Sequence, residues 1–406
     1  MTTVLELNDL ELTLHKGTET SYQSPAIAIV REDELIFGER AVRLSRIHPQ
    51  QANQQYFNRM NGDPLPQPIR KAANHADLVY LHLKELAEKN VGDTILAVPG
   101  TLNGDQLGVL LGICQEAGID VSGFVNAAVA STTTTPTPEQ VTYLDVYLQH
   151  MLLSELRIND EVRHERSFEV RDCGFTNLVD GWMNLIADRF VQETRFDPLH
   201  TAASEQQLYN QVYDWVLGAH VRTEVAFQVA HNDQQRRVEV PRSQLEQKSA
   251  QRIDRLIDAL PARQPLVLSA RAARIPGLSN HLKRAGFELT LLAADAVAAG
   301  CDQHMDLVRT VDTELRLVSR LPHTSRVLNG TPDHQPLPTH LLKDHLARPL
   351  AGPDTPAIEQ RDNGLYVMPA ANLTLNNAPL TAAARLDLGD VIGTPEGSFT
   401  AIRLEP

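Results

Sequence analysis

The sequence lacks the long apolar segment that a membrane-spanning helix requires. None of its 406 residues belongs to an apolar run of the necessary length, which is about 18 residues, so we expect no membrane insertion. The N-terminal residues also lack the basic stretch and apolar stretch of a secretory signal peptide. Cysteine is scarce, and Cys114, Cys173 and Cys301 lie far apart. We therefore expect no disulfide framework and no cysteine metal site, and we predict a cytoplasmic location.

Basic side chains are outnumbered by acidic ones. The chain has 37 Lys and Arg against 51 Asp and Glu, which gives a formal net charge of −14. Because an acidic surface repels phosphate groups, this balance argues against nucleic acid and anionic membranes as partners. A hydrophobic content of 42 % is sufficient for large cores and excludes a disordered chain. The length predicts two or three structural units.

An α/β order of elements occurs twice along the chain. A strand hairpin near the N-terminus is followed by further strands, by a helix over 76–89, by a strand over 94–98 and by a helix over 105–117. A similar order is repeated after the Thr/Pro-rich run 132–138, which we interpret as a linker. The sequence therefore predicts two α/β lobes with a cleft between them.

We place the first lobe at 1–138 and the second at 139–322. Prolines cluster over 323–362, which predicts a proline-rich tether, and 363–406 predicts a small β module. The stretch 372–392 faintly resembles the last strands of fork-head-associated domains, but the Arg, Ser and His with which that family reads phosphothreonine are not visible. We predict a compact β interaction module, with phosphopeptide binding as the alternative.

Five motifs resemble the ATPase domain of the seventy-kilodalton heat-shock chaperones, in the actin-like superfamily. They lie at 37–50, 98–119, 124–130, 274–277 and 295–300 and contain FGERAVR and HPQ, VPG and AGI, FVNAAVA, RIPG, and DAVAAG. Their order and spacing match those of the family over about residues 4–301. The resemblance implies a two-lobed actin-like fold in which the cleft of a typical member holds ATP and Mg²⁺.

The resemblance also marks where nucleotide chemistry belongs, and glycine is missing there. The family's phosphate loops need glycine because only a chain without a Cβ lets backbone N–H groups close on phosphate oxygens. The corresponding positions are Glu6 in the first loop, Asp145, Tyr147, Leu148, Gln149 and His150 in the second loop, and Ala270 and Arg271 in the adenosine loop. Of the family's residues at these positions, only the aspartate Asp145 remains.

The catalytic side chains that the resemblance implies are replaced as well. Asn58 stands in the place of the lysine that reaches the γ-phosphate, and an amide has no charge with which to stabilise phosphoryl transfer. Ala127 stands in the place of the glutamate that orients the attacking water. We therefore expect a pseudo-ATPase without catalytic residues, cofactor or metal, which binds a protein partner as an adaptor or assembly factor. The alternatives are a relative that still binds nucleotide in an altered cleft and an ATP-independent chaperone.

Several hypotheses concern single residues of the altered cleft. Arg271 is a candidate to fill the nucleotide site and to pair with Asp145 or Glu6 as an internal clamp. Asp145 could hold Mg²⁺, although a capped or salt-bridged aspartate is the more ordinary interpretation. His150 has no second ligand at metal spacing, so we expect it to be packed or solvated. An acid–base pair of Glu6 or Asp9 with Asp145 is left open.

Overall fold

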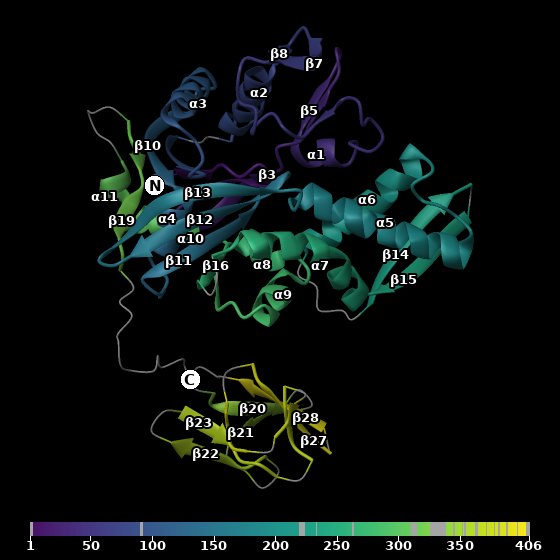
Figure 1. The fold of residues 1–406 in the computed structure, drawn as a ribbon, viewed down its shortest axis with the longest axis vertical. Helices are drawn as coiled ribbons and strands as arrows, with labels where there is room; N and C mark the ends of the chain where they lie inside the picture. The colour runs from purple at the N-terminus through teal and green to yellow at the C-terminus, as the bar shows by residue number, and fades with distance from the viewer. Residues whose placement is uncertain are drawn as a thin grey trace. The chain divides into compact units, whose positions relative to one another are not determined.

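The chain folds into two compact units, Met1–Val327 and Leu328–Pro406, each of which is described by itself. The computed structural model describes residues 3–89, 92–218, 224–232, 234–261, 264–309, 315–324, 338–343, 346–350, 352, 355–361, 364–370, 372–376, 378–380, 382–386, 389–395 and 397–402. Helices and strands alternate, and the main sheets of the first unit contain both parallel and antiparallel pairs (Figure 1). The predicted α/β class is therefore confirmed.

The first large sheet is built on the N-terminal hairpin. It has six strands in the order β18-β10-β9-β1-β2-β3. Their bounds are β1 Thr3–Glu6, β2 Leu12–Lys16, β3 Glu19–Ser24, β9 Asp93–Val98, β10 Asp120–Asn126 and β18 Leu317–Val318. The strands β1, β2 and β3 are antiparallel neighbours, whereas β9 is parallel to both β1 and β10.

The second large sheet repeats this plan. Its order is β17-β16-β11-β12-β13-β19, with β11 Gln140–Val146, β12 His150–Ile158, β13 Glu161–Arg171, β16 Leu266–Leu268, β17 Leu289–Leu291 and β19 Arg320–Pro322. The strands β11, β12 and β13 are antiparallel neighbours, and β16 is parallel to β11 and β17. The repeated order of elements in the sequence is thus present as a repeated strand order.

The lobe boundaries remain predictions, because residues 1–327 form one compact unit. The boundary at 138/139 falls between α4 and β11, but β18 returns from the end of the second predicted lobe to pair with β10. The start of the 132–138 run is packed, because Thr132 and Thr133 are buried and their hydroxyls donate to the carbonyl oxygens of Ala128 and Ala130. Positions 134, 136 and 138 of the run are exposed.

Helices cover both large sheets (Figure 1). Their bounds are α1 Gly38–Val42, α2 His75–Ala87, α3 Gly104–Glu116, α4 Ala127–Thr132, α5 Phe175–Thr194, α6 Ala202–Leu217, α7 Arg242–Ala259, α8 Ala270–Arg274, α9 Leu278–Arg284, α10 Ala296–Gln303 and α11 Met305–Val308. Both α2 and α3 begin with reciprocal side-chain caps, Asn74 with Asp77 and Asn103 with Gln106. Cys114 is buried on α3, as its apolar spacing predicts. None of the helices in the described part of the chain has the length and apolarity to cross a membrane.

Small residues let α4 and α10 pack closely beside the strand ends. A Cβ on Gly300 of α10 would lie 1.9 Å from the carbonyl oxygen of Ala130 on α4, so glycine is required at this contact. Ala127, the first residue of α4, is buried in the same apolar cluster as Val297 and Cys301 of α10. The small-residue motifs around 127 and 297 therefore form one packed helix pair.

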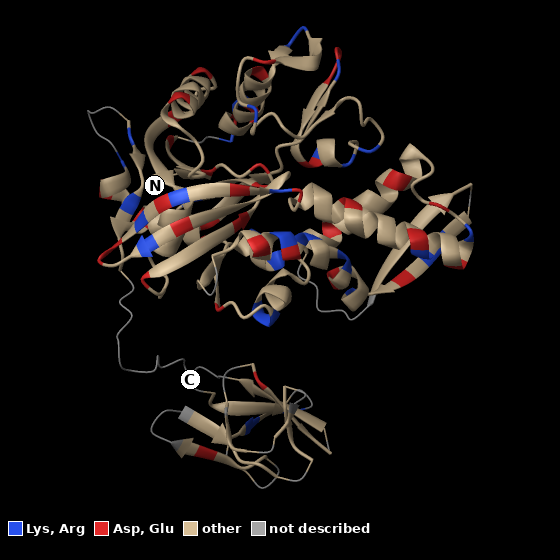
Figure 2. Cartoon of the chain, viewed as in Figure 1, with Lys and Arg blue, Asp and Glu red and all other residues tan. Residues whose placement is uncertain are grey.

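Smaller strand groups complete the first unit. They are β4 Ala28–Val30 with β5 Leu35–Phe37 and β6 Ala52–Asn53, β7 Pro64–Ile69 with β8 Ala72–Asn74, and β14 Glu224–His231 with β15 Gln234–Pro241. Acidic and basic side chains are interspersed along β13 (Figure 2), where Arg166 pairs with Glu155 of the adjacent strand at 2.6 Å.

The C-terminal unit starts earlier than the sequence predicts. Its strands are β20 His340–Lys343, β21 Leu346–Pro349, β22 Ile358–Arg361, β23 Gly364–Val367, β24 Thr374–Leu375, β25 Ala378–Pro379, β26 Ala384–Arg385, β27 Val391–Thr394 and β28 Gly397–Ile402. The strand β20 pairs with β28, and Leu341 is buried in the same core as Phe399. The prediction of a tether over all of 323–362 is therefore wrong, since burial of Leu341 draws this segment into the sheet. Residues 325–337 lie outside the described part of the chain.

Candidate functional site

The candidate site lies at the carboxyl ends of equivalent strands of the two large sheets. Glu6 is the last residue of β1, and Asp145 is the next-to-last residue of β11. Arg271 lies on α8, which directly follows the carboxyl end of β16. Ligands of α/β proteins commonly bind at such strand ends. The repeated sheet plan thus brings together three residues that are far apart in sequence.

Arg271 pairs with both acids, so the predicted internal clamp is confirmed as a set of contacts. Its Nη2 donates to Asp145 Oδ2 at 2.7 Å and also to Glu6 Oε1, and its Nε donates to Asp145 Oδ1 at 3.1 Å. The side chains of all three residues are at most 9 % exposed. The cation therefore bridges the two carboxylates inside the protein.

Asp145 is further held by neutral donors that the sequence analysis missed. Asn8 Nδ2 donates to its Oδ2 at 3.0 Å, and Ser269 Oγ donates to its Oδ1 at 2.5 Å. Asn8 also shapes the β1–β2 turn, because its Oδ1 accepts from the backbone N–H of Leu10. Ser269 caps α8 by accepting from the N–H of Ala272. Serine directly before a short helix is a sequence signal for a helix cap, so this role of Ser269 could have been predicted. The contact of Asn8 with Asp145 could not, because it depends on how the chain folds.

The clamp keeps Asp145 ionised despite its burial. Burial alone would raise the pKa of this carboxyl, but the charge of Arg271, with hydrogen bonds from Arg271, Ser269 and the Val146 N–H, holds the pKa below its ordinary value. Burial likewise works against the charge of Arg271, but Asp145 and Glu6 raise its pKa well above the ordinary value. Each charged form is thus stabilised by the other.

These contacts decide between the hypotheses for the acidic residues. Asp145 is the salt-bridged strand aspartate, with Arg271, Ser269, Asn8 and a backbone N–H on its two oxygens. Glu6 and Asp145 are not an acid–base pair, because Arg271 bridges them. The space next to the clamp is a cavity of about 20 Å³, lined by Ala270 and Leu292 among others. A cavity of this size has room for a water molecule but is far below the ~300 Å³ at which pockets for drug-sized ligands begin.

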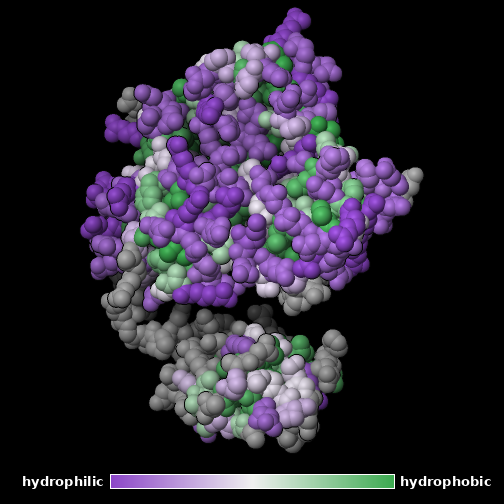
Figure 3. Space-filling model, turned by 45° about the vertical axis from the view of Figure 1, so that its right-hand side comes forward, coloured by the Kyte–Doolittle hydropathy of each residue, from purple (hydrophilic) through white to green (hydrophobic). Residues whose placement is uncertain are grey.

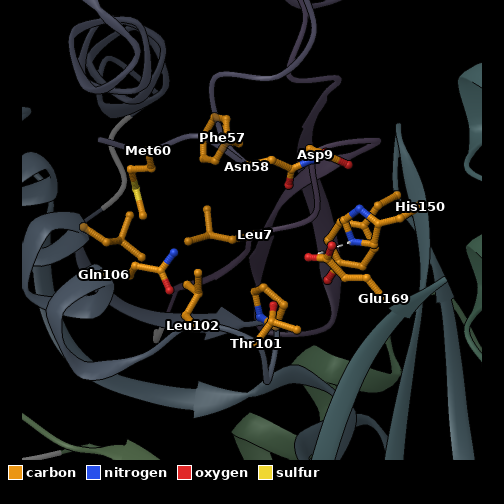
Figure 4. Close-up of a pocket in the computed structure, with 13 residues that line it drawn as sticks. Leu7, Asp9, Phe57, Asn58, Met60, Thr101, Leu102, Gln106, His150 and Glu169 are labelled. Atoms are coloured by element: carbon orange, nitrogen blue, oxygen red, sulfur yellow. Dashed lines mark hydrogen bonds and ion pairs between the residues drawn. The ribbon is translucent and has the colours of Figure 1, made fainter. Parts of the chain in front are cut away.

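A second, open cavity contains Asp9 (Figure 4). Its volume is about 100 Å³, well below the ~300 Å³ at which pockets for drug-sized ligands begin. Residues of the β1–β2 turn, the 57–60 segment, the end of β9 and the start of β12 line it. The lining is Leu7, Asp9, Phe57, Asn58, Met60, Pro99, Thr101, Leu102, Gln106, Leu110, Tyr147, His150 and Glu169.

Asp9 differs from Asp145 in its partners. Its Oδ1 accepts from the N–H of Leu148 at 2.7 Å, and its Oδ2 accepts from Asn58 Nδ2 at 2.9 Å. Burial raises the pKa of Asp9 to about 7, and these two hydrogen bonds offset the rise only in part. The charges of Asp145 and Glu169 add to the rise. Asp9 is therefore a buried carboxyl that titrates near neutral pH.

The remaining predicted positions lie around these two features. Tyr147 is buried and stacks on His150, with ring centroids 4.8 Å apart. His150 is the packed histidine that the sequence predicts, and burial lowers its pKa. Gln149 donates to Thr176 Oγ1 at 3.4 Å and lines a separate polar cavity of about 330 Å³ together with Arg46 and Arg59. In the described ranges, no group of three or more His, Cys, Asp and Glu is arranged to hold a metal ion.

The comparisons with known proteins add no family to this description. Neither the protein-family models nor the curated proteins give a match to this chain. The Arg271 clamp and the Asp9 cavity are therefore the features of this chain that bear on its function.

Proposed function

We propose that the chain is a non-hydrolysing relative of the seventy-kilodalton heat-shock chaperone ATPases, with the two-lobed actin-like fold, and that it acts by binding a protein partner as an adaptor or assembly factor. The repeated strand plan of the two large sheets supports the relationship. The five motifs lie at strand ends and helices of that plan, and this also supports the relationship.

The observation that carries the proposal is the Arg271 clamp. A nucleotide at these strand ends would have to displace a buried guanidinium from two carboxylates, and each separated charge would then be buried without its partner. The adjacent 20 Å³ of space holds no nucleoside. Glu6 and Asp145 would also repel a triphosphate once Arg271 had moved.

The residues at the catalytic positions support the absence of hydrolysis. Asn58 is engaged as a neutral donor to Asp9, and Ala127 is packed in an apolar cluster. Phosphoryl transfer depends on positioned cations and on a positioned nucleophile. A site with an amide and a methyl group at those places supplies neither, so the proposed protein has no catalytic residue and needs no cofactor.

The face of the molecule shown in Figure 3 favours an adaptor over a chaperone that holds unfolded clients. On the face shown in Figure 3, hydrophobic residues occur in small groups among hydrophilic ones. A holding chaperone needs a large apolar surface. The C-terminal β unit has its own core around Leu341, Val367 and Phe399. In the proposal it is a separate interaction module, and the protein works in the cytoplasm, where its three unpaired cysteines stay reduced.

Calorimetric titration with ATP and ADP in the presence of Mg²⁺ tests the proposal. We expect no saturable heat and no phosphate release, while a nucleotide-binding heat-shock chaperone in the same instrument binds both. Micromolar binding would overturn the pseudo-ATPase and favour a relative that holds nucleotide in an altered cleft. A second assay, aggregation of a denatured test protein, separates the adaptor from the ATP-independent chaperone, since we expect the adaptor to leave aggregation unchanged.

A further inference from the structure

The Asp9 cavity has an acidic wall and an apolar wall (Figure 4). The polar lining is Asp9, Asn58, Thr101, Gln106, His150 and Glu169, and the apolar lining includes Leu7, Phe57, Met60, Leu102 and Leu110. Two of the lining residues are carboxylic acids, and none of those described is Lys or Arg. An anion would therefore meet two negative groups and no cation in this cavity.

Among the buried acids of the described residues, Asp9 alone has no cation as a partner. Glu6 and Asp145 are paired with Arg271, and Glu11 is paired with Arg274, which donates to both carboxylate oxygens at 2.6 Å. Asp9 receives only the N–H of Leu148 and the amide of Asn58. A buried carboxylate is stabilised most by a charged partner. The cavity thus offers an entering cation an acceptor that the protein itself leaves uncompensated.

We propose that this cavity binds an aliphatic primary ammonium group, with the ammonium at Asp9 and its methylene stem along the apolar wall. A volume of about 100 Å³ suits a short alkyl chain with one charged end. A bare metal ion is a poor match, because one whole wall is hydrocarbon and supplies no ligands. A lysine side chain of the protein partner has the required chemistry. The assignment of the ammonium to a lysine of a protein partner rests on the proposed function, whereas the preference of the cavity for an ammonium group does not.

Binding of an ammonium at this place is linked to the proton on Asp9. The titratable groups around Asp9 are Asp145, Glu169, His150, Tyr147 and Tyr56. Burial lowers the pKa of His150 and raises those of Tyr147 and Tyr56 well above the usual value, so at pH 7 the histidine is not a cation and the tyrosines are not anions. An alkylammonium keeps its charge up to about pH 10. Binding therefore favours ionised Asp9 and releases a proton, and affinity increases about tenfold between pH 6 and pH 8.

Titration of the full chain with n-butylammonium and with Nα-acetyl-lysine methylamide tests the proposal, with n-butanol and Nα-acetyl-norleucine methylamide as uncharged controls of similar shape. We expect saturable binding of both ammonium compounds, at least tenfold tighter than their controls and tighter at pH 8 than at pH 6. Equal binding of charged and uncharged compounds would overturn the proposal. If butylammonium binds and the lysine derivative does not, the ligand is a small free amine, and the assignment to a lysine of a protein partner is overturned.

Two variants assign the binding to this cavity. Asp9→Asn keeps the shape of the side chain and is expected to weaken ammonium binding at least tenfold, whereas Asp188→Asn, at an exposed position of α5, leaves it unchanged. Asn58→Lys places an ammonium of the chain itself next to Asp9 and is expected to block the ligand, with Asn58→Gln as its control. Undiminished binding in Asp9→Asn and Asn58→Lys would contradict the proposal.

The outcomes for ammonium and for nucleotide are independent. Ammonium binding together with ATP binding would overturn the proposed function and keep this inference. Absence of both would overturn this inference and keep the proposed function.

Discussion

Asp145, near the carboxyl end of β11, and Asp9, in the turn between β1 and β2, are both buried, yet their pKa values shift in opposite directions. The pKa of Asp145 lies below its ordinary value, whereas that of Asp9 rises to about 7. Burial acts in the same sense on both groups. The difference comes from Arg271, which contacts Asp145 and has no counterpart at Asp9.

The two aspartates thus have different surroundings. Around Asp145 a side chain of the protein provides the positive charge, and little space remains. Around Asp9 the cavity is larger, and none of the described residues that line it is Lys or Arg. In the proposed function, the filled, ion-paired region around Asp145 disfavours a triphosphate, and the larger acidic cavity around Asp9 favours a small cation. Each of the following variants alters one side of this comparison.

The largest effect is expected from Arg271→Met. It leaves Glu6 and Asp145 buried without their cation, which costs about 3–5 kcal/mol of unfolding free energy. Urea denaturation followed by tryptophan fluorescence measures this effect selectively, because Trp182 and Trp215 both belong to the first unit. Arg284→Met, at an exposed site of α9, is the matched control and should change stability by less than about 0.5 kcal/mol. A loss below about 1 kcal/mol in Arg271→Met would show that the clamp is not a buried ion pair in solution.

Asp9→Asn is expected to stabilise the protein, in a manner that depends on pH. Because the folded pKa of about 7 exceeds the ordinary value of 3.8, folded wild type loses stability as pH rises through this window. The variant has no such carboxyl, so its advantage grows from about zero at pH 4 to roughly 2–4 kcal/mol at pH 8. Denaturation midpoints of both proteins at these pH values check the difference, and an advantage that is equal at pH 4 and pH 8 would refute the assigned charge state.

Asn58→Lys should make Asp9 resemble Asp145. The introduced ammonium stabilises the ionised carboxyl and lowers its pKa, so we expect a gain of about 1–2 kcal/mol at pH 8, discounted for the exposure of position 58. The stabilising effect of Asp9→Asn at pH 8 should then fall by at least half in the Asn58→Lys background. Asn58→Gln, which adds length without charge, should leave that effect in place. Additive effects of the two substitutions would show that position 58 does not act on Asp9.

Ser269→Ala is expected to give the smallest change, about 1 kcal/mol of destabilisation. It removes one hydrogen bond to Asp145 and the cap of α8, while Arg271 and Asn8 still contact the carboxylate. Ser279→Ala on α9 is the control, since its hydroxyl is a buried group without a hydrogen-bond partner in the described residues. The two variants are compared by the same fluorescence measurement, and equal midpoints would remove Ser269 from the support of the clamp.

The sequence predicts the helices and the repeated plan well, because their signals are local. The apolar spacing over 105–117 and the glycine after it define α3 to within one residue at each end. The pairing of Arg271 was also predicted, because the resemblance to the chaperone ATPases placed this arginine, Glu6 and Asp145 around one site. The role of Asn8 and the charge state of Asp9 could not be predicted from the sequence, because they depend on contacts made across more than 130 residues of sequence. The prolines of this region predicted a tether, but Leu341 of β20 is buried in the same core as Phe399 of β28, so this segment is part of the sheet.

The most direct test of the central claim is a calorimetric titration of the full chain with ATP and Mg²⁺ at pH 7. The Arg271 clamp predicts no saturable binding at millimolar nucleotide and no release of phosphate. Stoichiometric binding with a micromolar dissociation constant would contradict it, because nucleotide could then enter only by displacing Arg271 from Glu6 and Asp145.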